Sequence, residues 1–275
     1  MINKDSAVAV DNADWLKTAA IIFVVVDHIG YFFIDDAQWW TAFGRIAAPI
    51  FFFLLGYAHS LTIPLRWISL GLVLTLLDSW NNDWTWVAPN ILFSLAFIRF
   101  ARPFVLRRLQ HDRWVSFTVL ILILLMVLPI TGDMVEYGAE GWLWALVGLC
   151  QRMYVDGRSS TGLDGTGQKP EVPVQGVNQN WGLKRVLACS IAAIVYVWQE
   201  QIEFEFSEFQ LAVVVLGVGL LSYWLSVFVR GPSCVQPPER ISVPLRYIGR
   251  HTLEIYAIQL AGSELIIRLI PQIAA

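Results

Sequence analysis

The chain has 275 residues, of which 56% are hydrophobic and 15% are charged, and its mean hydropathy is +0.57. A soluble domain carries about 25% charged residues, so this composition excludes a soluble globular protein. The net charge of −3 gives no field suited to nucleic acid and excludes it as a partner. The three cysteines have no CxxC spacing, which indicates neither a disulfide framework nor a metal site. We expect an all-α helix bundle in the lipid bilayer, built as a single domain over residues 1–275.

Nine segments are predicted to cross the membrane. A spanning helix needs about 20 mostly apolar residues. The candidate segments are 15–34, 43–61, 65–79, 84–101, 114–131, 139–155, 184–201, 209–229 and 250–270. Many of their ends carry tryptophan, a residue that prefers the depth of the lipid headgroups.

The distribution of Lys and Arg predicts the orientation of these segments. The stretches 99–113, 152–185 and 230–250 contain five, five and four basic residues, whereas 35–42, 78–83, 132–140 and 200–208 contain none. Basic residues accumulate in cytoplasmic loops. We therefore expect a cytoplasmic N-terminus and an external C-terminus.

Two polar stretches complete this topology. Residues 1–14 are polar and have no separate apolar stretch before Trp15, so we expect no cleavable signal peptide. The long 156–181 segment is rich in Gly, Ser, Pro and Gln, which predicts a flexible cytoplasmic loop. Its GTGQKP sequence lacks the GK[ST] ending of a phosphate-binding loop, so we expect no nucleotide there.

A few ionisable and amide side chains lie inside the predicted spans. Such groups are costly in the bilayer and mark candidate functional sites. At 1.5 Å per residue, His28, Asn90 and Glu264 each lie about 9 Å from the outer surface, and Arg45 lies slightly shallower. We therefore predict one polar cavity. Asp27 and His28 point about 100° apart on a helix, so we expect one of them to face Arg45 and the other the substrate.

Each of these residues also has a structural interpretation. His28 could be a polar clasp between helices, Arg45 could extend to the interface, and Glu264 could form an i,i+4 ion pair with Arg268. Asp133, Glu136 and Glu140 form a predicted acidic outer loop that could attract a cationic amine. Glu140 is thus a candidate for substrate binding, with Asn90 and Glu264.

Several sequence blocks resemble the TraX family, typified by an enzyme that acetylates the N-terminus of F pilin. LKTAAIIFVVVDHIG is similar to its first-helix signature, FGRIAAPIFFFLLGYAHSLT to its GRIAxPIFxFL helix, and APNILFSLAF to a third segment. The later blocks VEYGAEGWLWALVG and RYIGRHTLEIYAIQL also resemble it. The family is thought to be related to transmembrane acyltransferases that use an intramembrane histidine and cytoplasmic acetyl-CoA. In some relatives the last-helix motif ends in His where this chain has Gln259.

The resemblance implies acetyl transfer in the bacterial inner membrane, from acetyl-CoA as co-substrate to an amine or hydroxyl of an acceptor at the membrane or outer side. His28 is the candidate general base, because neutral imidazole serves as a base near neutral pH. Arg45, or else Asn90, would stabilise the oxyanion, and Asp27 would compensate the buried charge. Six arginines on the cytoplasmic face could bind the phosphates of the coenzyme, or anionic lipid: Arg99, Arg102, Arg107, Arg108, Arg152 and Arg246.

Two other classes of function stay open. In a proton-coupled transporter, Asp27, His28 and Glu264 would form a proton relay. A non-catalytic membrane scaffold would leave their shared depth unexplained. The acceptor is equally open, because a peptide amine, a sugar and a small amine all fit the predicted site.

Overall fold

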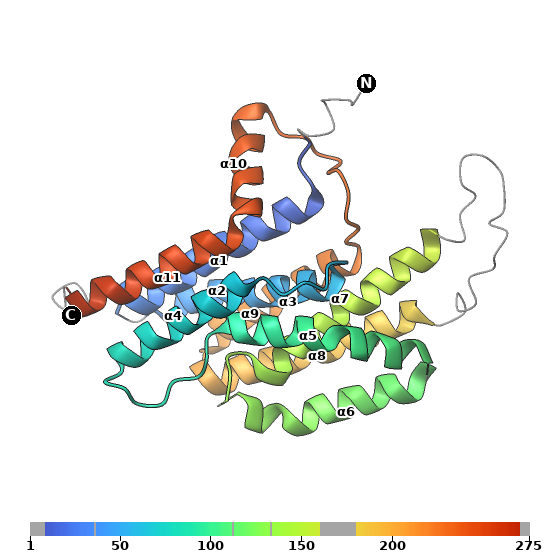
Figure 1. Cartoon of the computed structure of the whole chain (residues 1–275), viewed down its shortest axis with the longest axis horizontal. Helices are drawn as coiled ribbons and strands as arrows, with labels where there is room; N and C mark the ends of the chain where they lie inside the picture. Colours follow the sequence, from blue (N-terminus) through green and yellow to red (C-terminus); the bar gives the residue numbers. More distant parts are fainter. Residues whose placement is uncertain (1–8, 36, 112, 133, 160–179, 270–275) are drawn as a thin grey trace.

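The computed structural model describes residues 9–35, 37–111, 113–132, 134–159 and 180–269, and these segments are helical apart from turns, short extended connections and one isolated bridge (Figure 1). The helices are α1 (Asn12–Phe33), α2 (Gln38–Gly44), α3 (Ala47–Tyr57), α4 (Leu65–Asn81), α5 (Ile91–His111), α6 (Arg113–Thr131), α7 (Gly138–Ser159), α8 (Trp181–Phe204), α9 (Glu208–Ser226), α10 (Glu239–Arg250) and α11 (Thr252–Leu269). The predicted all-α class is confirmed. Most of the 156–181 loop lies outside the described residues.

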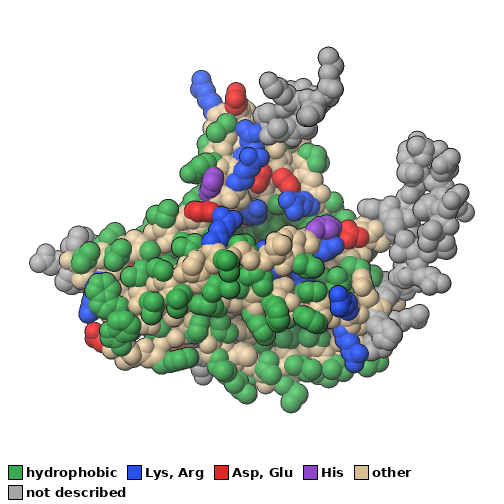
Figure 2. Space-filling model, in the orientation of Figure 1, with side chains coloured by type: hydrophobic (Ala, Val, Ile, Leu, Met, Phe, Trp, Pro, Cys, Tyr) green, Lys and Arg blue, Asp and Glu red, His purple; other side chains and the backbone are tan. Residues whose placement is uncertain are grey.

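Five helical segments are long and apolar enough to cross a membrane: Asn12–Phe33, Gln38–Tyr57, Trp114–Thr131, Trp181–Phe204 and Glu208–Ser226. The chain is therefore a multi-pass membrane protein. Figure 2 agrees, because hydrophobic side chains cover most of the body on the face shown. Helices α4, α5, α7 and α11 occupy the other four predicted segments. The count of nine spans and their orientation stay predictions.

The fourth predicted segment, 84–101, begins at the wrong residue. Asp83 and Trp84 have φ of 50° and 60°, and the helix starts only at Ile91. Pro89 explains the delay, because a proline disfavours helical backbone in the residue before it. Asn90 then caps the helix, with its Oδ1 accepting a hydrogen bond from the backbone N–H of Leu92 at 3.2 Å. Asn90 thus lies at a helix start and not within a span.

The densest packing in the bundle lies between α3 and α7. A Cβ atom on Gly56 would lie 1.9 Å from the backbone oxygen of Ala145, and one on Gly148 would lie 2.0 Å from that of Phe53. Both positions therefore require glycine, since any side chain would separate the helices. Buried Trp144 and Tyr196 stack edge to face beside this contact and extend the core toward α8.

Helix α10 was not predicted, because the sequence analysis placed a loop at 230–250. In Figure 1 it stands across α1 and α11, while the long helices run along the long axis of the molecule. Its sequence, ERISVPLRYIGR, includes Pro244, a residue that normally argues against a helix interior. Pro244 lies in the second turn of α10 and has no N–H to donate to the backbone oxygen four residues earlier, that of Arg240.

Candidate functional site

A cavity of about 710 Å³ runs through the bundle beside α1. One stripe of this helix lines it, formed by Ala13, Lys17, Val24, His28 and Tyr31. The stripe is about 27 Å long at 1.5 Å per residue, close to the thickness of the hydrocarbon core of a bilayer. The lining also contains the other residues of the predicted polar layer, namely Arg45, Asn90 and Glu264. The prediction that these side chains share one cavity is confirmed.

Apart from Arg45, which lies among acidic residues, the charged residues of the lining are largely separated by sign. Basic residues lie at the end where α1 begins, and we call this group the basic mouth: Lys17, Arg66, Arg99, Arg230 and Arg250. Acidic residues from α7, α8 and the segment before α7 lie toward the other end, and we call this group the acidic chamber: Glu136, Glu140, Glu200 and Glu203. The cavity is thus electrically polarised along its length.

Side-chain contacts fix which ends of the helices meet. Arg66, at the start of α4, forms a 2.6 Å ion pair with Glu254 at the start of α11, and Asn81 at the end of α4 bonds Glu264 near the end of α11. Helices α4 and α11 are therefore parallel. Lys17 Nζ donates to the backbone oxygen of Gly249 at 3.2 Å, beside the start of α11. The basic side chains of α1 and α4 consequently lie at the same end of the cavity.

Arg45 lies between two carboxylates. It forms an ion pair with Asp27 on α1 and a second one, with an N–O distance of 3.4 Å, with Glu200 on α8. All three side chains are largely buried, with 11%, 13% and 3% of their surfaces exposed. The guanidinium also stacks on the Phe204 ring at 4.7 Å. This confirms the prediction that Asp27 or His28 faces Arg45, and it identifies Asp27 as that residue.

His28 faces a different helix. Its Nδ1 lies 2.8 Å from Oε1 of Gln259 on α11. An amide oxygen only accepts hydrogen bonds, so Nδ1 carries the hydrogen and Nε2 keeps a lone pair. The ring packs edge-on against Phe32 and lies 6.1 Å from the Tyr256 ring. Gln259 therefore fixes the tautomer of the imidazole, a role that the sequence analysis missed.

Two glycines in the DHIG and GRIA blocks allow this arrangement. A Cβ atom on Gly44 would lie 2.3 Å from the Cβ of Asp27, and one on Gly30 would lie 2.3 Å from the Cβ of Trp40. Helices α1 and α2 can therefore approach closely only with glycine at both positions. Gly44 in particular brings Asp27 within reach of Arg45.

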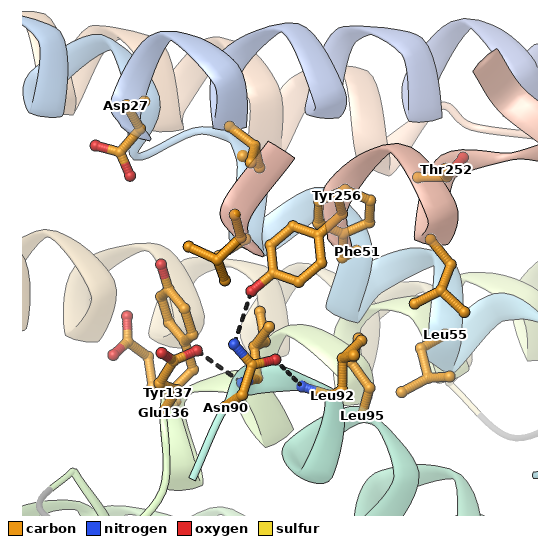
Figure 3. Close-up of a pocket in the computed structure, with 18 of the residues that line it drawn as sticks. Asp27, Phe51, Leu55, Asn90, Leu92, Leu95, Glu136, Tyr137, Thr252 and Tyr256 are labelled. Atoms are coloured by element: carbon orange, nitrogen blue, oxygen red, sulfur yellow. Dashed lines mark hydrogen bonds between the residues drawn. The ribbon is translucent and has the colours of Figure 1, made fainter. Parts of the chain in front are cut away.

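Asn90 and Glu136 are tied to each other through the start of α5 (Figure 3). Asn90 Nδ2 donates to the hydroxyl oxygen of Tyr256 at 3.0 Å, and Glu136 Oε2 accepts from the backbone N–H of Ile91 at 2.7 Å. Asp27 points into the cavity from α1 on the opposite side, as Figure 3 shows. Burial raises the pKa of Glu136 to about 7. The amide of Asn90 is thus engaged in bonds that hold α5 and α11 together.

The first part of the chain identifies the family to which the protein belongs. A sequence model described as TraX protein matches residues 12–154, just over half of the chain. The chain belongs to the TraX family. No curated protein and no solved structure matches it.

The TraX match covers α1 to α6 and most of α7. It therefore contains Asp27, His28 and Arg45. Glu200 and Gln259, which bond Arg45 and His28, come from α8 and α11 beyond the matched residues. The TraX segment thus supplies most of the cavity lining, including opposite sides of it, and α8 and α11 supply further partners of its polar side chains.

Glu264 and Glu140, both predicted to bind substrate, differ in their hydrogen bonds. Glu264 accepts hydrogen bonds from Asn81, while Arg268 lies 3.6 Å from Asp83, so the proposed i,i+4 pair of Glu264 with Arg268 is wrong. Glu140 lies in the first turn of α7, and its buried Oε1 has no hydrogen-bond partner among the described residues. Glu140, like Asp27 with its buried Oδ1, is therefore a carboxylate with an acceptor atom still available in the cavity wall.

The six predicted coenzyme-binding arginines do not form one group. Arg99 belongs to the basic mouth. Arg102 donates to the backbone oxygen of Leu55 and Arg152 to that of Ala58, at the end of α3. Arg107 and Arg108 are exposed farther along α5, and Arg246 lies on α10. The sequence analysis missed Lys17, Arg66, Arg230 and Arg250 as lining residues, because their helices come together only in the fold.

Among the described residues, no group of three or more His, Cys, Asp or Glu side chains has the geometry to hold a metal ion. The polar groups that line the cavity are imidazole, guanidinium, ammonium, carboxylate, amide and hydroxyl groups.

Proposed function

We propose that the chain is an integral membrane acetyltransferase that moves an acetyl group from cytoplasmic acetyl-CoA to an amine or hydroxyl of an acceptor at the membrane or outer side. One observation carries this proposal: a single cavity runs along most of α1, with a group of basic residues near the start of the helix and His28 near the acidic residues toward its other end. Such a cavity offers separate places to an anionic donor and to an acceptor, with a base on the acceptor's side.

The basic mouth is the proposed site for the phosphates of coenzyme A. Guanidinium and ammonium groups are the usual partners of phosphate oxygens. Lys17 and His28 are eleven residues apart on one straight helix, or about 16 Å. The extended pantetheine arm covers such a distance. Phosphates bound near Lys17 would thus leave the thioester close to His28.

The proposed reaction uses the free nitrogen of His28. The acceptor reacts as a neutral amine or a hydroxyl, whose electron pair attacks the thioester carbonyl carbon while Nε2 takes the proton that the nucleophile loses. An amine that enters protonated first gives its extra proton to a carboxylate of the acidic chamber. The tetrahedral intermediate collapses, its C–S bond breaks, and the thiolate of coenzyme A receives the proton from the imidazolium. The products are the acetylated acceptor and free coenzyme A, and the histidine returns to its starting state.

Arg45 is the proposed oxyanion donor. Its two terminal nitrogens bond Glu200 and Asp27, but its Nε has no hydrogen-bond partner among the residues described. A fixed donor in a water-poor cavity stabilises the charge that develops on the carbonyl oxygen. The carboxylates of Asp27 and Glu200 keep the guanidinium in one orientation. Asn90 is less suited, since its amide is already bonded.

The acidic chamber favours an amine as acceptor. Glu140 has a free carboxylate oxygen in the cavity wall, and Glu200 and Glu203 act electrostatically on it. Clustered carboxylates attract a protonated amine and offer nothing comparable to a neutral sugar. We therefore expect a primary amine to be acetylated more efficiently than a sugar hydroxyl.

The experiment is an acetylation assay with purified protein in lipid nanodiscs, acetyl-CoA, and either a primary amine or a sugar, with the product measured by mass spectrometry. His28→Ala should reduce turnover by about 10² to 10⁴, the usual value of a positioned base. His59→Ala is the matched control, because His59 is exposed beyond the end of α3. Its turnover should equal that of the wild type.

A proton-coupled transporter is the second candidate, favoured by the buried carboxylates along the cavity. It predicts no acetylated product with any acceptor, and a pH gradient that drives substrate uptake into proteoliposomes. If folded His28→Ala kept the specific activity of the wild type, this result would contradict the proposed role of His28 as the base.

A further inference from the structure

Helix α10 packs across the first turns of α1. Leu245 and Gly249 are buried in this contact, and the backbone oxygen of Leu245 accepts a hydrogen bond from the hydroxyl of Thr18 at 3.4 Å. Gly249 lies so close to α1 that an added Cβ would be 2.6 Å from a carboxylate oxygen of Asp14. Since α1 is long and apolar enough to cross a membrane, a helix that stands across its first turns is oriented to lie along the membrane surface (Figure 1).

The two flanks of α10 beside this contact have opposite character. At 100° per residue, Ile241, Pro244 and Ile248 fall on one flank, about 180° from a second flank that carries Glu239, Arg246 and Arg250 and one apolar residue, Val243. Ile241 is 49% exposed although it is apolar. Figure 2 shows Lys and Arg side chains gathered where α10 meets the hydrophobic body. The basic flank includes Arg250 of the basic mouth.

We propose that α10 is an interfacial helix that docks on the anionic phospholipid leaflet at the end of the bundle where α1 begins. Its apolar flank would enter the boundary between headgroups and acyl chains, about 5–10 Å deep, as amphipathic surface helices do. Its arginines would lie at the level of the lipid phosphates, whose negative charge complements them. Because the two flanks lie on opposite sides of the α1 contact, this orientation buries Ile241 and leaves Arg250 at the cavity mouth.

The connections of α10 keep it in this position. Before the helix, Asn12 N–H donates to the backbone oxygen of Gly231 at 3.0 Å, and Ser233 N–H donates to that of Val10 at 2.9 Å. After the helix, only His251 separates it from α11. Because α10 is fixed at both ends, the position of the lipid surface would affect, through this helix, the positions of Lys17, Arg230 and Arg250. The leaflet would therefore help to set the geometry of the basic mouth.

Spin labels at two matched positions test the docking. Ile241 and Val243 are each 49% exposed in the protein but lie about 160° apart around α10. Each is replaced by cysteine in a Cys234→Ser background, which removes the exposed native thiol, and the full-length protein is placed in nanodiscs that contain anionic phosphatidylglycerol. Buried Cys150 and Cys189 remain in the Cys234→Ser variant. The label that this variant takes up without an added cysteine is measured by mass and subtracted.

For each label we compare its collision rate with oxygen, which concentrates in lipid, to its collision rate with a water-soluble nickel complex. This ratio should be at least several-fold higher at residue 241 than at residue 243. Removal of the anionic lipid should reduce this ratio at 241. Equal ratios at the two positions would overturn the proposal that α10 docks on the leaflet through its apolar flank. This holds whether both labels are exposed to water or both are exposed to lipid. A ratio at 241 that does not depend on anionic lipid would overturn the role given to the arginines. Neither result depends on acetyl transfer.

Discussion

Arg45→Lys should destabilise the protein markedly, although the substitution keeps the charge. Arg45 reaches Asp27 with one terminal nitrogen and Glu200 with the other, on two different helices. A lysine has one nitrogen on a flexible stem and cannot reproduce a planar fork. At least one largely buried carboxylate would therefore lose its charged partner.

The size of the effect follows from these contacts. A hydrogen bond to a charged group contributes about 1.5–3 kcal/mol, and removing one partner of a buried pair costs about 3–5 kcal/mol. Because lysine retains one of the two bonds, we expect a loss of about 2–4 kcal/mol. For a chain of 275 residues that corresponds to a fall in Tm of roughly 3–7 °C.

The assay is thermal unfolding in detergent, followed by intrinsic fluorescence, for which the chain has 13 tryptophans. The matched control is Arg230→Lys, because Arg230 pairs with Asp11 at an exposed position and should change Tm little. In the double variant Arg45→Lys with Glu200→Gln, residue 200 has no charge, so the lysine needs to form an ion pair only with Asp27. The double variant should therefore lose about 1 kcal/mol less than the sum of the single variants. A Tm of Arg45→Lys within 1 °C of the wild type would refute this reasoning and favour an arginine that merely extends to the interface.

Three further outcomes are expected. Gly44→Ala should weaken the Asp27–Arg45 pair and reduce both Tm and turnover, because its Cβ would occupy the position of the Asp27 side chain; Gly219→Ala, in open space, is the control for both measurements. The pKa of Glu136 is raised from 4.5 to about 7, so the folded state binds the proton more tightly and stability should fall by up to about 3 kcal/mol as pH rises from 4.5 to 7. Glu136→Gln should flatten that part of a Tm-against-pH curve, and an unchanged slope would exclude Glu136 as its source. Tags at the N-terminus and after Ala275 should be accessible from opposite sides of the membrane, and a common side would contradict the nine-span topology.

The helices were predictable where local signals agree. Asp11 with Asp14 and Ser207 with Gln210 form capping boxes at the starts of α1 and α9, each followed by a long apolar run. Both helices begin within three residues of the predicted segments. Helix α10 was not predictable from hydropathy, because an amphipathic surface helix carries too many polar residues to resemble a span.

The contents of the site were predictable, but its pairings were not. Depth in the predicted spans brought His28, Arg45 and Glu264 to one cavity, since intramembrane polar groups are few, whereas Asn90 lines the cavity from the start of a helix. The bonds that orient them join residues far apart in sequence, 155 positions for Arg45 with Glu200 and 231 for His28 with Gln259. No local pattern contains that information, because it depends on how α8 and α11 are arranged around α1.

The glycine contacts between α3 and α7 also determine which side of the cavity can move. Gly56 and Gly148 bring two backbones into direct contact, so sliding one helix past the other would force atoms together. Opposite this rigid wall, α4, α5 and α11 meet through a small cluster of Leu74, Leu92 and Ala257. Fewer buried contacts give a lower cost of local opening. We therefore expect a bulky acceptor to enter, and its product to leave, sideways between α4 and α11, while the wall formed by α3 and α7 stays still through each turnover.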